Sequence, residues 1–175
     1  MCMAGNENPS QQSTAEQSNS QNPGKDVMTT EQIVTMKTSV ESSIDEFMKS
    51  VGYKEPAENT DSEGWRHFVK GSAQGMCGVT FENNSLFFKA VAKVMDVPSD
   101  KTLILPLMRK LLELNLAIKN EAKIGIKNNI VWLAMMKPAE YMQKSDVPRS
   151  INFTMSMADY IDDYLQKQYD GTSKK

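Results

Sequence analysis

Apolar residues between Leu103 and Met136 follow first a helical and then a strand-like spacing. Four leucines recur at spacings of four, four and three residues, which places them on one helical face. They are Leu103, Leu107, Leu111 and Leu114, and we expect Ile104, Met108 and Leu112 to widen that face. After Asn115 apolar residues alternate with others, as in β-strands. The stretch therefore predicts a helix and then a β-hairpin that turns at Lys127-Asn128-Asn129.

The preceding part of the chain has the same two kinds of pattern. Helical spacing predicts a helix from Thr30, its N-cap, to Val51, with Gly52 just beyond its end. Three alternating segments then predict an antiparallel meander with a tight turn at Asn83-Asn84. The predicted strands are residues 65–70, 76–82 and 85–94.

The remaining patterns complete the predicted order of elements. Ser99 or Asp100 is expected to cap the middle helix. Because proline fits only the first turn of a helix, Pro106 predicts that this helix becomes regular near Leu105. Helical spacing returns over residues 149–168 and predicts a last helix. The fold class is therefore α+β, in the order α-β-β-β-α-β-β-α, with helices packed on a five-stranded antiparallel sheet.

Composition divides the chain of 175 residues into one domain and two tails. Gln, Ser and Asn dominate the N-terminal segment, which is too poor in apolar residues to form a core. We expect residues 1–28 to be disordered, residues 29–170 to form one domain, and residues 171–175 to be a disordered C-terminal tail.

Composition also argues against several classes of function. A net charge of −2 and a pI of about 5.5 do not favour nucleic acid as a partner. No apolar run is long enough to span a membrane, and two cysteines with one histidine cannot form the usual zinc site. His67 has no recognisable nucleophile motif to work with. We expect no enzyme activity, catalytic residue, cofactor or metal.

Cys2 opens an alternative interpretation. A cysteine at the start of a Ser/Gln/Asn-rich tether resembles the acylated cysteine of a mature bacterial lipoprotein. On this reading Cys2 is a lipidation site, and the protein is tethered to the cell envelope without inserting its folded domain.

Several predicted strands carry large apolar residues on both faces. A strand that is apolar on both faces is normally buried on both, either by helices or by a second subunit. We expect the surplus apolar residues to form a protein-binding or dimer interface. They are Phe87, Val91, Val131, Leu133 and Met135.

Three segments carry a resemblance to a known family: SLFFKAVAKVMDVPSDK from position 85, LLELN from 111, and AKIGIKNNIVWLAMMKP from 122. With this order of elements, the chain resembles the YbjN family, which shares the fold of type III secretion chaperones of the Tir-chaperone (CesT) class. The resemblance covers residues 33–165. It implies a small homodimeric domain that has no known active site and binds other proteins along apolar grooves.

The favoured interpretation is a non-enzymatic protein-binding module, a cytoplasmic YbjN-like regulator or chaperone that acts as a homodimer. A type III secretion-type effector chaperone is one alternative. The cell-envelope protein anchored through Cys2 is the other, and its location would be the membrane.

Overall fold

The computed structural model describes residues 28–70, 73–119 and 121–169. The order of helices and strands in these residues confirms the predicted α-β-β-β-α-β-β-α arrangement. The elements are α1 (Thr30–Ser50), β1 (Arg66–Lys70), β2 (Ala73–Glu82), β3 (Ser85–Asp96), α2 (Lys101–Ala117), β4 (Ala122–Lys127), β5 (Ile130–Pro138) and α3 (Asp146–Tyr169), with short 3-10 helices η1 (Pro56–Asn59) and η2 (Ala139–Tyr141).

The five strands form one antiparallel sheet in the order β1-β2-β3-β5-β4, so β1 and β4 are its edges. Both predicted hairpin turns are present. Asn83 and Asn84 have φ angles of 49° and 60°, and Asn128 and Asn129 have 53° and 59°. Tight hairpins need this left-handed conformation, and asparagine adopts it more readily than most residues.

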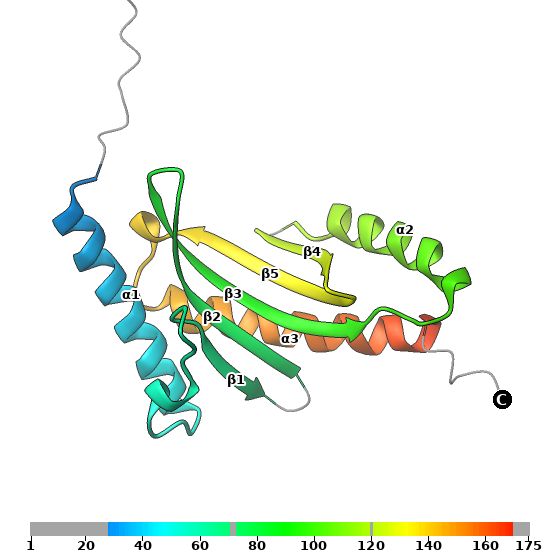
Figure 1. Cartoon of the computed structure of the whole chain (residues 1–175), viewed down its shortest axis with the longest axis horizontal. Coiled ribbons are helices and arrows are strands. Elements are labelled where there is room, and N and C mark those ends of the chain that lie inside the picture. Colours follow the sequence, from blue (N-terminus) through cyan, green and yellow to red (C-terminus); the bar gives the residue numbers. More distant parts are fainter. Residues whose placement is uncertain (1–27, 71–72, 120, 170–175) are drawn as a thin grey trace, which may run out of the picture.

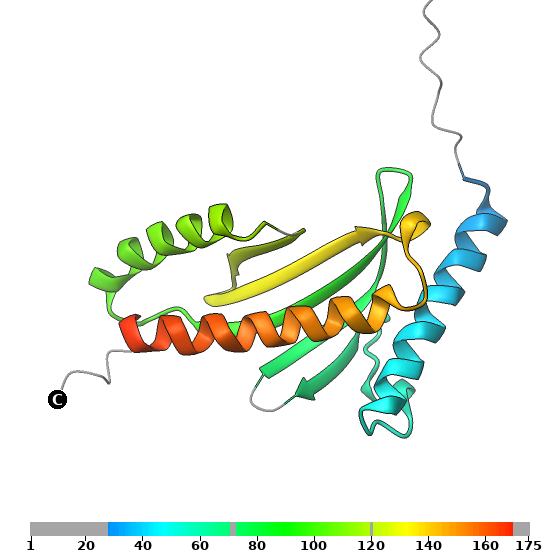
Figure 2. The same cartoon turned by 180° about the vertical axis from the view of Figure 1, so that it is seen from behind.

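The described helices cover one face of the sheet. Helix α3 runs along β3 and β5, and α1 packs beside it against β2 (Figures 1 and 2). None of the described helices crosses the face that is turned to the viewer in Figure 1. Helix α2 lies next to the edge strand β4. We call the face under α1 and α3 the closed face and the other the open face.

The core fills the space between the closed face and the helices. Its largest fully buried side chains come from all three helices and the central strands: Phe88, Ile44, Met48, Leu107, Leu133, Ile151, Met155, Ile161 and Leu165. The approach of α3 is close at Gly75, where a Cβ atom would lie 2.5 Å from the sulfur of Met155. Glycine therefore lets the helix sit directly on β2.

Several predicted details are wrong. Strand β2 begins at Ala73 rather than at residue 76, and α3 begins at Asp146 rather than at residue 149. Helix α2 starts at Lys101 rather than near Leu105. Asp100, one of the two expected caps, accepts a hydrogen bond from the Thr102 amide and begins the helix there. Pro106 lies inside this helix, where it removes one backbone hydrogen bond. The N-cap of α1 is Thr29, which forms a capping box with Gln32.

Candidate functional site

The five residues predicted to form an interface lie on opposite faces of the sheet. Phe87 and Val91 are half-buried on the open face. Val131 and Leu133 are fully buried and Met135 is 5% exposed, all in the core beneath the helices. These three side chains therefore do not lie on an exposed surface where a partner could contact them, contrary to the prediction. A role for Phe87 and Val91 in partner contacts stays a prediction.

The register of β3 and β5 explains the difference. Val91 pairs with Ala134, and Lys93 pairs with Trp132. Directly paired residues share a face of a sheet, so Trp132, Ala134 and Met136 accompany Val91 on the open face. The sequence alternation showed that β5 has two apolar faces, and only the pairing shows which one the helices cover.

A hollow lies on the open face at the β4–β5 hairpin. Its volume is about 490 Å³, and most of its lining is apolar. The lining includes Met76 from β2, Val91 from β3, Trp132 and Ala134 from β5, and Lys123 and Lys127 from β4. The indole Nε1 of Trp132 donates a hydrogen bond of 3.3 Å to the Lys127 carbonyl, which ties the ring to the hairpin. We call this hollow the hairpin groove.

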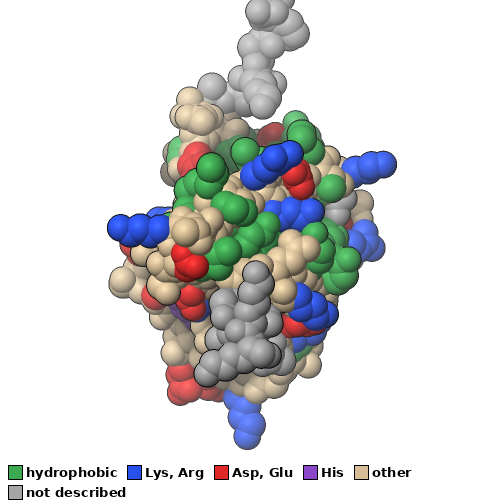
Figure 3. All heavy atoms as spheres, turned by 90° about the vertical axis from the view of Figure 1, so that its right-hand side faces the viewer, with side chains coloured by type: hydrophobic (Ala, Val, Ile, Leu, Met, Phe, Trp, Pro, Cys, Tyr) green, Lys and Arg blue, Asp and Glu red, His purple; other side chains and the backbone are tan. Residues whose placement is uncertain are grey.

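Helix α2 has a second apolar stripe that the sequence analysis missed. Met108 and Leu112, expected to widen the buried face, are 46% and 68% exposed. With Leu105 and Leu116, 75% and 88% exposed, they recur at spacings of three, four and four residues. We call Leu105, Met108, Leu112 and Leu116 the outer stripe. Leu107 and Leu111 point the other way into the core, so α2 is apolar on two sides. Hydrophobic side chains gather on the side of the molecule where α2 lies (Figure 3).

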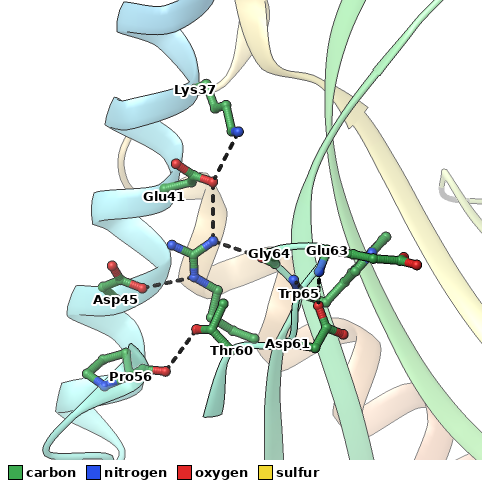
Figure 4. A network of polar contacts seen from close by, with 10 residues as sticks. Lys37, Glu41, Asp45, Pro56, Thr60, Asp61, Glu63, Gly64 and Trp65 are labelled. Carbon is green, nitrogen blue, oxygen red and sulfur yellow. Dashed lines mark hydrogen bonds and ion pairs between the residues drawn. The ribbon is translucent and has the colours of Figure 1, made fainter. Parts of the chain in front are cut away.

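A charged network holds α1 against the sheet at β1. The Arg66 side chain is 11% exposed and lies 3.1 Å from an oxygen of Asp45 and 3.3 Å from one of Glu41. It also donates a hydrogen bond of 2.9 Å to the Gly64 carbonyl. Figure 4 shows the carboxylates of Glu41 and Asp45 on α1 turned toward the loop before β1. The network therefore ties α1 to β1 and to the loop before it.

The described residues offer little else that resembles a reactive centre. Burial raises the pKa of the Cys77 thiol to about 12, so this cysteine is unreactive. His67 contacts Asp61 at 2.8 Å on the surface, and that hydrogen bond lowers the pKa of the Asp61 carboxyl. In the described ranges no cluster of potential ligands could hold a metal ion, and no helix is long and apolar enough to cross a membrane. The predicted lipidation site, Cys2, lies outside the described residues.

Comparison with known proteins gives matches among solved structures. No family model and no curated protein match the sequence. A chain of the ExsC–ExsE complex matches with a TM-score of 0.58 and 14% identity, over 73% of this chain and 93% of that one. A chain of the HopA1–SchA chaperone–effector complex gives 0.52 and 10%, over 71% and 93%. A chain of the complex of the Yersinia pestis type III secretion chaperone SycH with a YscM2 fragment gives 0.48 and 12%, over 68% and 96%.

The first two matches carry the comparison, and at such identities they show the fold alone. The chain has a type III secretion chaperone-like fold, which confirms the fold implied by the sequence resemblance. The resemblance to the YbjN family in particular stays a prediction.

Proposed function

We propose that this protein is a non-enzymatic, cytoplasmic protein-binding module that works as a homodimer, either as a chaperone or as a YbjN-like regulator. The outer stripe of α2 carries the proposal. Four large apolar side chains, each at least 46% exposed, follow one line on a single helix. Apolar side chains scattered singly are normal on a surface, whereas a contiguous line of them is typical of an interaction site.

A second copy of the chain is the simplest cover for the outer stripe. In a two-fold dimer each stripe would pack against its counterpart, so one helix supplies both halves of the contact. Full burial of a side chain of this size contributes about 1.5–3 kcal/mol. Four such side chains from each copy can offset an association cost of about 4–15 kcal/mol.

The matched folds also favour a second partner, besides another copy of the chain, that is itself a protein. The matched structures contain two proteins each, and one of them is named a chaperone–effector complex. The open face adds a second, separate apolar surface, the hairpin groove. The unreactive thiol of Cys77 and the surface pair of His67 and Asp61 do not resemble a catalytic site.

Native mass spectrometry of the tagged full-length protein, purified gently from its source cells, tests this proposal. We expect an assembly that contains two copies of the chain together with a bound polypeptide. Recovery of the chain alone as a monomer, with no bound polypeptide, would contradict both parts of the proposal.

A further inference from the structure

We propose that the hairpin groove binds an acidic amphipathic segment of the partner protein, whose apolar side chains fill the groove while its carboxylates pair with Lys123 and Lys127. This inference rests on the proposed function and adds to it the chemistry of the partner. Three observations carry it: the apolar floor of the groove, a gap above Gly125, and two lysines that form no ion pair with any described residue.

The floor of the groove comes from three neighbouring strands. Met76, Val91 and Trp132 are half-buried there, and none of the described helices covers them. A partner side chain in this position would remove apolar surface from water on both molecules. The groove is wide enough for several side chains but is open on one side, which suits a segment laid across it better than an enclosed small molecule.

Gly125 makes the gap at the edge of the groove. It pairs with Trp132, so it lies on the open face between Lys123 and Lys127. A Cβ atom added to Gly125 would have no atom within 4 Å. The glycine is therefore not needed for packing among the described residues, and its missing side chain leaves space on the open face of β4 at the position paired with Trp132.

The charges around the groove favour an acidic partner. On β3, Lys89 forms an ion pair with Glu82, and Lys93 forms one of 2.8 Å with Asp96. Lys123 and Lys127 are exposed, and neither has an ion pair among the residues that the structure describes. The chain as a whole has a net charge of −2, so Lys123 and Lys127 form a local positive patch on an acidic protein. Such a patch attracts and orients a segment of opposite charge.

Other occupants fit this groove less well. The N-terminal segment of the chain has no Ile, Leu, Val or aromatic residue before Val27, so it lacks large apolar side chains of those kinds to fill the groove. A second copy has the outer stripe of α2 as its contact surface. A nucleic-acid base could stack on Trp132, but Met76, Val91 and Ala134 give the rest of the floor no aromatic surface, and the net charge of −2 disfavours a polyanion.

Selection of short peptides from a random displayed library on the full-length protein tests the inference. We expect the enriched peptides to combine several apolar residues with Asp or Glu and to carry a net negative charge. A labelled consensus peptide should bind about tenfold more weakly to the double variant Lys123→Glu/Lys127→Glu, a loss of about 1.4 kcal/mol. Gly125→Val should weaken binding similarly by filling the gap, while its thermal midpoint stays at or above that of wild type.

Matched variants separate the groove from other effects. Lys54 and Lys167 are also exposed lysines, so Lys54→Glu/Lys167→Glu makes the same change of charge elsewhere and should leave peptide affinity unchanged. Light scattering should find both double variants as dimeric as wild type. A variant at Lys123 and Lys127 that becomes monomeric would instead make the groove part of the dimer contact and overturn the inference.

The remaining outcomes distinguish this inference from the proposed function. Enriched peptides without acidic residues, or peptides that bind all variants equally, would overturn the acidic-segment inference and leave a protein-binding module in place. A random single-stranded oligonucleotide that binds with the same sensitivity to the lysines would also overturn it. A monomeric wild-type protein that enriches no peptide would overturn both.

Discussion

The side chain of Asn115 bonds to the backbone of Ile124 as a neighbouring β-strand would. Its amide nitrogen donates to the Ile124 carbonyl at 2.8 Å, and its oxygen accepts from the Ile124 amide, also at 2.8 Å. Asn115 lies in the last turn of α2, and Ile124 lies in the middle of the edge strand β4. The contact joins α2 to the sheet and occupies backbone groups at which another strand could pair.

Replacing Asn115 by leucine should therefore open the edge of β4. The two lost hydrogen bonds should lower the free energy of unfolding by about 1–3 kcal/mol. The amide of Ile124 should exchange with solvent much faster, which NMR-detected hydrogen exchange measures. Asn115→Asp keeps the acceptor and loses the donor, so it should protect Ile124 to an intermediate degree. Unchanged protection of Ile124 in Asn115→Leu would contradict this role.

Two neighbouring methionines on β5 should respond very differently to a carboxylate. Met135 is 5% exposed beneath the helices and Met136 is 43% exposed on the open face. Met135→Asp should cost more than about 3 kcal/mol, because a carboxylate would be buried without partners. Met136→Asp should change stability by about 0.5 kcal/mol or less. Urea denaturation measures both, and equal losses would contradict the assignment of faces.

The charged network at α1 predicts a further contrast. Arg66→Met leaves Glu41 and Asp45 without their shared cation, and we expect a loss of about 1–3 kcal/mol in stability. Lys37 also faces Glu41, but at 3.9 Å with its side chain 53% exposed. Lys37→Met should therefore cost less than about 0.5 kcal/mol. The same denaturation experiment would contradict the network if both variants had the same stability.

The buried thiol of Cys77 predicts a pH dependence. Burial favours the neutral thiol and raises its pKa from 9.0 to about 12. Below pH 9 the thiol is neutral in both the folded and the unfolded chain, so its full contribution to folding stability is present. That contribution is lost as the pH rises toward 12. At pH 8 iodoacetamide should modify Cys77 only after the chain unfolds, as peptide mass mapping would reveal. Rapid modification of the folded protein would show that the site is open.

The sequence predicted the order of elements because local rules govern it. Alternation located the strands, and the Asn-Asn pairs marked both tight turns. The start of α2 was wrong because the helix runs from its cap at Asp100 through Pro106 without interruption. The pattern change after Asn115 placed the end of the helix close to its observed end at Ala117, but the bond from Asn115 to Ile124 depends on the docking of α2 beside β4.

The candidate site was harder to predict, because it depends on which apolar surfaces remain uncovered. Leu112 and Leu111 are equally apolar and adjacent in sequence, yet Leu112 is 68% exposed and Leu111 is 5% exposed. Only the packing of α2 separates them. Met135 and Trp132 lie on opposite sides of β5, as alternation along a strand implies, but the sequence does not show which side α3 covers.

The most direct test of the proposed dimer is light scattering behind a sizing column, over a range of protein concentrations. Wild-type protein should have the mass of a dimer, and Leu112→Glu/Leu116→Glu should have the mass of a folded monomer. Val34 and Tyr160 are 58% and 70% exposed on other helices, so Val34→Glu/Tyr160→Glu should remain dimeric. A wild-type monomer at all concentrations, or a dimer that survives the change at Leu112 and Leu116, would contradict the assignment of the outer stripe as the dimer surface.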